Sequence, residues 1–171
     1  MTAARRERKV RRPTVLLRPA GAFVALWAGF GLGATPMRAA TTEMVVTNRH
    51  TGLAVDGFDP VAYFTEAAPR TGRAAFEARS GGVTWRFANE GNRAAFTAAP
   101  DVYMPRFGGY DPIAVARGGA SAGHPELWLI VRQRLYLFYS EAARAAFAAD
   151  PEDAIEAAER HWPEVQRTLA R

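Results

Sequence analysis

The chain has 171 residues, no cysteine and a formal net charge of +5 at pH 7. The lack of cysteine excludes disulfides, thiol catalysis and cysteine-ligated zinc or iron–sulfur centres. Residues 1–40 carry eight basic residues and one acidic residue, a net +7, whereas residues 41–171 carry 14 basic and 16 acidic residues, a net −2. The positive charge therefore belongs to the N-terminal segment, and the rest of the chain has no electrostatic basis for binding nucleic acid.

Residues 1–40 have the pattern of a signal peptide: a basic region, a short apolar region and small residues near a cleavage site. The uncharged run covers residues 19–37, and Ala39-Ala40 supplies the small residues. We expect export to the bacterial periplasm or beyond, with membrane contact only during export. The alternative is that residues 19–37 remain as a membrane anchor. The pair Arg11-Arg12 loosely resembles a twin-arginine signal, so the general secretory and twin-arginine routes both stay open.

The first element predicted in the body of the chain, residues 41–171, is a short helix that starts at Asp59-Pro60. Aspartate accepts hydrogen bonds from the free amides of a helix start, and proline suits the first helical position. A β-hairpin follows, with strands at 75–79 and 83–87 around a Ser80-Gly81-Gly82 turn. An alanine-rich helix then starts after Asn89 and ends near Pro100.

The same order of elements is predicted a second time. Its members are the Asp111-Pro112 helix start, strands at 127–131 and 135–139 around Arg132-Gln133-Arg134, and a helix capped by Ser140 that ends near Pro151. Residues 85–100 and 136–151 are identical at 8 of 16 positions at a shift of 51, and residues 57–63 resemble residues 109–115 at a shift of 52. Two segments that agree at nearly the same shift indicate an internal duplication, with 57–103 and 109–154 as its units.

A C-terminal helix is predicted from Asp150-Pro151, because Ile155, Ala158 and Trp162 fall on one helical face. Pro163 is expected to end this helix and to start a last one. The predicted fold is α+β: a small single domain of two repeated loop–β-hairpin–helix units plus a C-terminal helix.

The stretch 106–125 is rich in glycine and has no clear periodicity, so we expect a long loop over the core. Loops of this length in a compact domain are usually functional or mobile. A binding site is therefore expected within residues 104–125.

Several motifs resemble the YHS domain. They are residues 57–64, Trp85-Arg86-Phe87, Phe96, Pro100, residues 103–110, residues 135–139 and His161-Trp162-Pro163. The resemblance spans about residues 50–165 and identifies 41–171 as a YHS-like domain. It implies a stand-alone exported bacterial protein in a family associated with metal handling, copper included.

One position departs from the family pattern. In that pattern the Gly-Gly-Tyr motif is usually followed by cysteine, whereas Gly108-Gly109-Tyr110 is followed here by Asp111. A carboxylate replaces the soft ligand, which argues against thiolate-dependent copper binding and leaves oxygen–nitrogen coordination open.

The candidate ligand-binding residues all lie in or beside the repeated motifs. They are Asp59, Tyr63, Tyr103, Arg106, Tyr110 and Asp111. The two aspartates either cap short helices or meet across the repeat interface, where paired carboxylates bind a hard cation or share a proton. The tyrosines either line a pocket or belong to the core with the hydroxyl at its edge. His124 is the candidate metal ligand.

The expected function is a non-catalytic binding module that acts through residues 104–125 on a small ligand, an ion or a partner protein, without a cofactor. The alternative is an accessory metal-handling protein that uses Asp59, Asp111 and His124. The sequence has no nucleophile elbow, phosphate-binding glycine loop or acid–base pair, so an enzyme is not expected.

Overall fold

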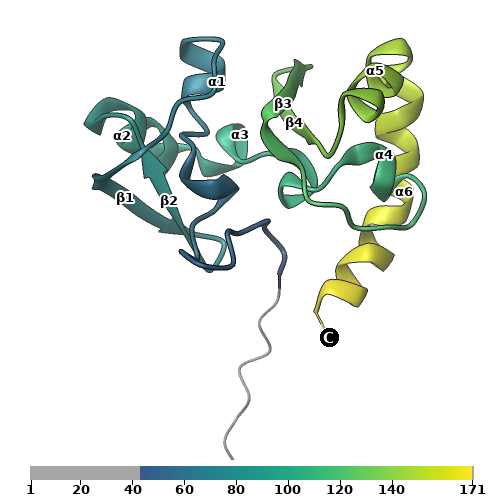
Figure 1. Ribbon diagram of the computed structural model, residues 1–171, viewed down its shortest axis with the longest axis horizontal. Helices are drawn as coiled ribbons and strands as arrows, with labels where there is room; N and C mark the ends of the chain where they lie inside the picture. The colour runs from purple at the N-terminus through teal and green to yellow at the C-terminus, as the bar shows by residue number, and fades with distance from the viewer. Residues whose placement is uncertain (1–42, 171) are drawn as a thin grey trace, which may run out of the picture. The chain divides into compact units, whose positions relative to one another are not determined.

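A computed structural model describes residues 43–170 and is shown in Figure 1; the expected signal peptide lies outside the described residues. The described residues belong to one compact unit, and its fold is α+β, as predicted. In chain order the elements are η1 (Val55–Gly57), α1 (Ala62–Thr65), β1 (Arg73–Ser80), β2 (Val83–Phe87), α2 (Glu90–Ala98), α3 (Pro100–Tyr103), η2 (Arg106–Gly109), α4 (Pro112–Val115), β3 (His124–Val131), β4 (Arg134–Phe138), α5 (Glu141–Ala149) and α6 (Pro151–Leu169), where η denotes a 3-10 turn. No helix within residues 43–170 is long and apolar enough to cross a membrane.

The fold consists of a first repeat (55–103) and a second repeat (107–154). The series η1-α1-β1-β2-α2 corresponds to η2-α4-β3-β4-α5, and each antiparallel hairpin forms a separate two-stranded sheet. Both hairpins have a register shift near the start of the first strand, between Arg73 and Glu77 and between His124 and Trp128. The predicted duplication is confirmed, and both first strands begin slightly earlier than predicted.

The backbone of the two repeats agrees even where it is unusual. The residues of η1, from Val55 to Gly57, have φ of 50°, 51° and 80°, and their counterparts from Phe107 to Gly109 have φ of 53°, 63° and 88°. At Gly108 a Cβ atom would lie 1.9 Å from the carbonyl oxygen of Met44, so only glycine fits there. This close approach places Met44 and Val45 against the second repeat.

Each repeat has its own aromatic core. Phe96 of α2 contacts Trp85 and Phe87 of β2, with ring centroids 5.1 Å apart in both pairs. In the second repeat the counterparts are Phe147 with Tyr136 and Phe138, at 4.9 and 5.1 Å. Trp85 and Tyr136 occupy equivalent places, as the sequence predicts.

Strand β4 lies between the two cores. Side chains alternate across a strand, so Tyr136 and Phe138 enter the second core while Leu135 and Leu137 enter the first. The second hairpin therefore covers the first repeat. On β2 the matching outward positions are held by Thr84 and Arg86, which are only partly buried.

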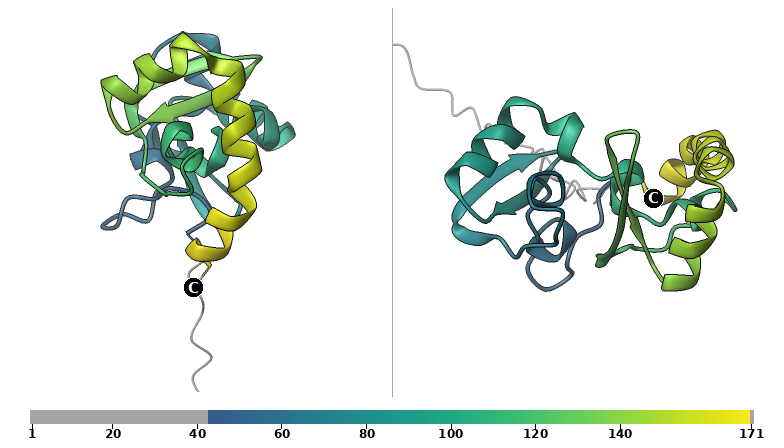
Figure 2. Two further views of the ribbon diagram at one scale, coloured as in Figure 1. Left: turned by 90° about the vertical axis from the view of Figure 1, so that its right-hand side faces the viewer. Right: turned by 90° about the horizontal axis from the view of Figure 1, so that it is seen from above.

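Helix α6 covers the second repeat, and Figure 2 shows it running beside α4. Ile155, Ala158 and Val165 are its buried residues. The expectation that Pro163 starts a new helix is wrong, because α6 continues through it to Leu169. An interior proline costs about 3 kcal/mol, and the buried residues on both sides of Pro163 offset that cost.

The expectation of one long loop over 106–125 is also wrong. Residues 106–109 form η2 and residues 112–115 form α4, so the irregular connection runs only from Ala116 to Gly123. Helix α4 follows the helix start that Asp111-Pro112 predicts. The turn η2 was not predicted, because a turn with positive φ has no hydrophobic period.

Candidate functional site

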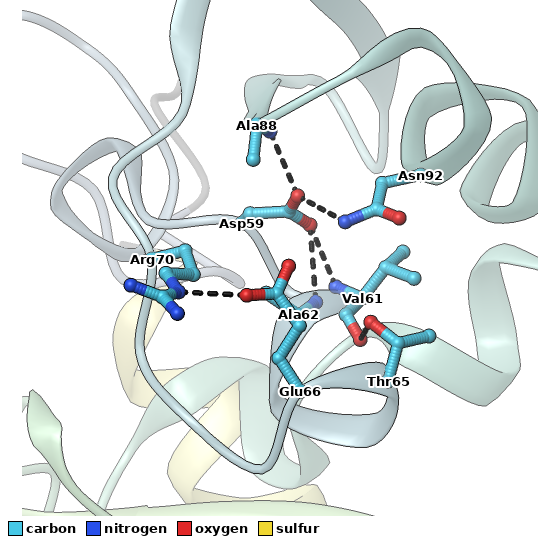
Figure 3. A network of polar contacts seen from close by, with 8 residues as sticks. All are labelled: Asp59, Val61, Ala62, Thr65, Glu66, Arg70, Ala88 and Asn92. Carbon is cyan, nitrogen blue, oxygen red and sulfur yellow. Dashed lines mark hydrogen bonds and ion pairs between the residues drawn. The ribbon is translucent and has the colours of Figure 1, made fainter.

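Asp59 is fully buried and serves as the polar centre of the first repeat (Figure 3). Its Oδ1 accepts hydrogen bonds from the backbone N–H groups of Val61 (2.8 Å) and Ala62 (3.3 Å) at the start of α1. Its Oδ2 accepts from the backbone N–H of Ala88 (2.8 Å) and from Nδ2 of Asn92 (2.6 Å). The carboxylate therefore fixes α1 to the junction between β2 and α2.

Asp111 repeats this arrangement in the second half, where it is 2 % exposed. Its Oδ1 accepts from the backbone N–H groups of Ile113 (2.8 Å) and Ala114 (3.4 Å), and its Oδ2 accepts from the N–H of Tyr139 (2.9 Å). The helix-cap interpretation is confirmed for Asp111, which is the N-cap residue of α4. Asp59 makes the corresponding bonds to Val61 and Ala62, although the N-cap position of α1 itself is Val61. The interpretation that they meet as a pair is wrong, because each carboxylate is occupied by donors of its own repeat.

Two of the candidate tyrosines are packing residues. Tyr63 is 1 % exposed, its hydroxyl donates to the carbonyl oxygen of Pro125 at 2.8 Å, and its ring packs edge-on against Trp128 at 5.3 Å. Burial, and then the negative charges of Asp59 and Glu126, raise the pKa of Tyr63 well above its ordinary value. Tyr103 packs edge-on against Phe64, with ring centroids 5.4 Å apart. Neither lines a described cavity.

Arg106 belongs to a polar cluster at the edge of the second core. Its Nη2 lies 2.7 Å from Oε1 of Glu159 on α6, and its guanidinium lies over the ring of Phe107. Burial is the main influence on Tyr136 and raises its pKa, whereas the nearby positive charge of Arg106 lowers it. Arg106 therefore fixes α6 to η2.

His124 is exposed, and its Nδ1 accepts a hydrogen bond from the backbone N–H of Glu126 at 3.2 Å. No hydrogen bond joins it to either aspartate within residues 43–170, and each carboxylate is held by donors of its own repeat. Among residues 43–170, no group of three or more histidine, aspartate or glutamate side chains is arranged to hold a metal ion. The structure does not assemble the donor set that the metal-handling alternative requires.

Tyr110 is the predicted site residue that borders a cavity. Its ring packs against Trp162, with centroids 6.2 Å apart, and its hydroxyl donates to the carbonyl oxygen of Glu43 at 2.9 Å. Burial, and then the charge of Glu43, raise the pKa of Tyr110. The cavity beside it has a volume of about 250 Å³ and is lined by Glu43, Val46, Thr47, Arg49, Tyr110, Ala120, Ala122 and Leu169.

The cavity lies where three parts of the chain meet. Tyr110 and Ala122, which form an isolated β-bridge, come from the expected segment 104–125. The other walls come from residues 43–49 and from the last turn of α6. Sequence reasoning missed those two walls, because neither carries a motif. The helical period that ends at Leu169 was the available signal for the wall from α6, and no sequence signal places residues 43–49 at the cavity.

No family model matches the chain, and comparison with curated proteins and with solved structures found no match.

Proposed function

We propose that this chain is an exported, non-catalytic binding module of the YHS type that holds a small ligand in the cavity beside Tyr110. The observation that carries the proposal is that Tyr110, Ala120 and Ala122 of the segment 104–125, where the sequence predicts a site, form one wall of this cavity. Small-molecule sites are concave and use a few polar groups to orient the ligand. Polar and apolar side chains line this cavity in about equal measure, and its volume of about 250 Å³ limits it to a small ligand.

The walls indicate the chemistry of the ligand. Val46, Ala122 and Leu169 offer an apolar surface. Arg49 is exposed and forms no ion pair with any residue between 43 and 170, so its guanidinium is free to bind an anionic group. A small carboxylate with a short apolar tail satisfies both features when its charged group lies at Arg49 and away from the carboxylate of Glu43, which also lines the cavity.

The buried polar groups support binding rather than catalysis. Asp59 and Asp111 are occupied by backbone donors, and Tyr63 by Pro125. Within the described part of the chain, no buried side-chain nitrogen or oxygen lacks a hydrogen-bond partner. These groups therefore stabilise the fold, and a ligand is held by the cavity walls.

The test is a thermal-shift screen of the purified protein with short-chain carboxylates of two to six carbons and with the matching amines. We expect carboxylates to raise the melting temperature and amines to leave it unchanged. The substitution Ala122→Leu fills the cavity and should abolish the shift. The control is Thr71→Leu at the equivalent exposed position of the first repeat, which should respond like the natural protein. If no carboxylate stabilises the natural protein, or if both variants respond alike, the proposal is wrong.

A further inference from the structure

A second concave surface lies in the first repeat, away from Tyr110. This groove of about 490 Å³ is lined by Glu77 and Ala78 of β1 and by Glu90, Arg93, Ala94, Thr97 and Ala98 of α2. Glu77 and Ala78 are successive residues of one strand, so their side chains point to opposite faces of the hairpin. A groove that both of them border therefore runs along the edge of β1.

That edge is free to pair. Among residues 43–170, β1 is hydrogen-bonded to β2 alone, so its other side presents unpaired backbone N–H and C=O groups. An exposed strand edge is a template for the addition of an extended peptide. The neighbouring face of α2 carries small side chains, Ala94, Thr97 and Ala98, which leave room for side chains of an added strand.

The duplication shows why the groove belongs to the first repeat. Trp85 and Tyr136 are equivalent, and they pair with Ala78 and Leu129 respectively. Leu129 packs against the second core. The leucine therefore fills, in the second repeat, the space that the smaller Ala78 leaves open in the first. The helix positions match as well, since Ala94 corresponds to Ala145 at the shift of 51.

Charge along strand β1, beside the groove, indicates which partner it accepts. The two glutamates of the groove lining, Glu77 and Glu90, form ion pairs with Arg86 and Arg93. Arg73 and Arg79 of β1 then give this surface a net charge of +2. Arg79 is exposed and forms no ion pair within the described residues. An acidic partner is attracted to this surface, whereas a second copy of the same edge is repelled by it.

We propose that the first repeat binds an acidic peptide segment of a partner protein as an added strand along β1, beside α2. Backbone hydrogen bonds to β1 hold the segment. Its small apolar side chains enter the groove at Ala78 and Ala94, and its acidic side chains pair with Arg79. This site is independent of the cavity beside Tyr110.

The test uses the purified protein, fluorescently labelled, on an array of hexapeptides. In each peptide glutamate alternates with alanine, valine, isoleucine, leucine or threonine, and a matched set has lysine in place of glutamate. We expect binding to the glutamate set and no binding to the lysine set. A proline in the middle of the best glutamate peptide should abolish binding, because proline cannot complete a strand ladder.

Matched variants separate the groove from general charge attraction. Ala94→Leu fills the groove and should weaken binding about tenfold or more, whereas Ala145→Leu, at the equivalent exposed position of α5, should leave the affinity unchanged. The reversal Arg79→Glu should weaken binding with no change in the melting temperature. The proposal is overturned if glutamate and lysine peptides bind alike, if no peptide binds, or if Ala94→Leu and Ala145→Leu act equally. It is also overturned if sedimentation velocity shows a dimer that Ala94→Leu dissociates, because a second copy then occupies the edge.

Discussion

Asp59 and Asp111 hold the same place in the two repeats, 52 residues apart in the sequence. Each joins the start of a short helix to the residue that follows the second strand of its own hairpin, Ala88 at 2.8 Å and Tyr139 at 2.9 Å. The first carboxylate also accepts from Asn92, whereas the matching position in α5 is Ala143. The aspartate of each Asp-Pro motif therefore binds the helix start beside it and also a residue about 28 positions further along the chain, and we call this second contact a clamp.

Removing the negative charge of either clamp should destabilise the fold. In Asp59→Asn or Asp111→Asn an amide group faces backbone N–H donors and leaves at least one of them unsatisfied. We expect the free energy of unfolding to fall by about 2–3 kcal/mol, with the larger loss at Asp59. Urea titration measures the free energy of unfolding. The control is Asp101→Asn at an exposed position, which should lower the free energy of unfolding by less than about 0.5 kcal/mol. Losses at Asp59 and Asp111 no larger than the control would contradict the clamp.

Alkaline pH should destabilise the protein through its buried tyrosines. The pKa values of Tyr63, Tyr110 and Tyr136 are raised, mainly by burial. In the unfolded chain a tyrosine loses its proton near a pH of about 10, whereas in the folded protein it keeps the proton to higher pH. The stability from these tyrosines is therefore fully present below a pH of about 10 and is lost as the pH rises above it.

The substitution Tyr63→Phe should remove part of that alkaline loss. It deletes the hydrogen bond to Pro125 and costs about 1 kcal/mol at pH 7. Between pH 9 and about 11 the melting temperature should then fall less steeply than in the natural protein. The control is Tyr139→Phe, whose side chain is 68 % exposed, and which should keep the natural slope. An unchanged slope in Tyr63→Phe would show that other groups control the alkaline transition.

Polar residues on the outer face of the first hairpin should keep the protein from associating with itself. Arg86 pairs with Glu77 where the second hairpin has Leu137 and Trp128. The double substitution Thr84→Leu and Arg86→Leu recreates the apolar face that covers the first repeat, and exposes it. Sedimentation velocity should show larger species than for the natural protein. Arg160→Leu, on the exposed side of α6, is the control, and equal behaviour of both variants would refute the expectation.

We predict no tight copper(I) binding by the natural protein, because copper(I) prefers thiolate or thioether ligands. Asp111→Cys, which restores the residue usual in the YHS pattern, should raise affinity for thiophilic metals. It should also destabilise the fold by more than a simple cap loss of about 1 kcal/mol, since Tyr139 loses its acceptor. Competition against a copper(I) chelator measures the affinity of the natural protein and of Asp111→Cys. The control for a lone exposed thiol is Asp101→Cys. Stoichiometric tight binding by the natural protein would place the ligands elsewhere.

Export makes a separate prediction about the N-terminus. If residues 1–40 are a signal peptide, mass spectrometry of the protein from native cells should find a first residue between about 34 and 42. A cytoplasmic protein that begins at Met1 would contradict export, and an intact chain in the membrane fraction would favour the anchor.

Local features of this fold could be predicted from the sequence because their causes lie within a few residues. The Asp-Pro helix starts, the caps Asn89 and Ser140, and the two hairpins all depend on near-neighbour hydrogen bonds and turn chemistry. The repeat strengthened these predictions, since each element occurs twice. Where local signals failed, as at Pro163, packing on both sides of the residue outweighed its own preference.

Only the tertiary structure decided which faces meet. The continuous apolar run at 135–138 is typical of a strand buried on both faces, but it does not specify that Leu135 and Leu137 complete the core of the other repeat. The cavity beside Tyr110 likewise depends on residues 43–49 and Leu169, which are far apart in the sequence. Hydrophobic periodicity shows that a side chain is buried without specifying its partner, because apolar contact is non-directional. The partners are chosen when the whole chain folds.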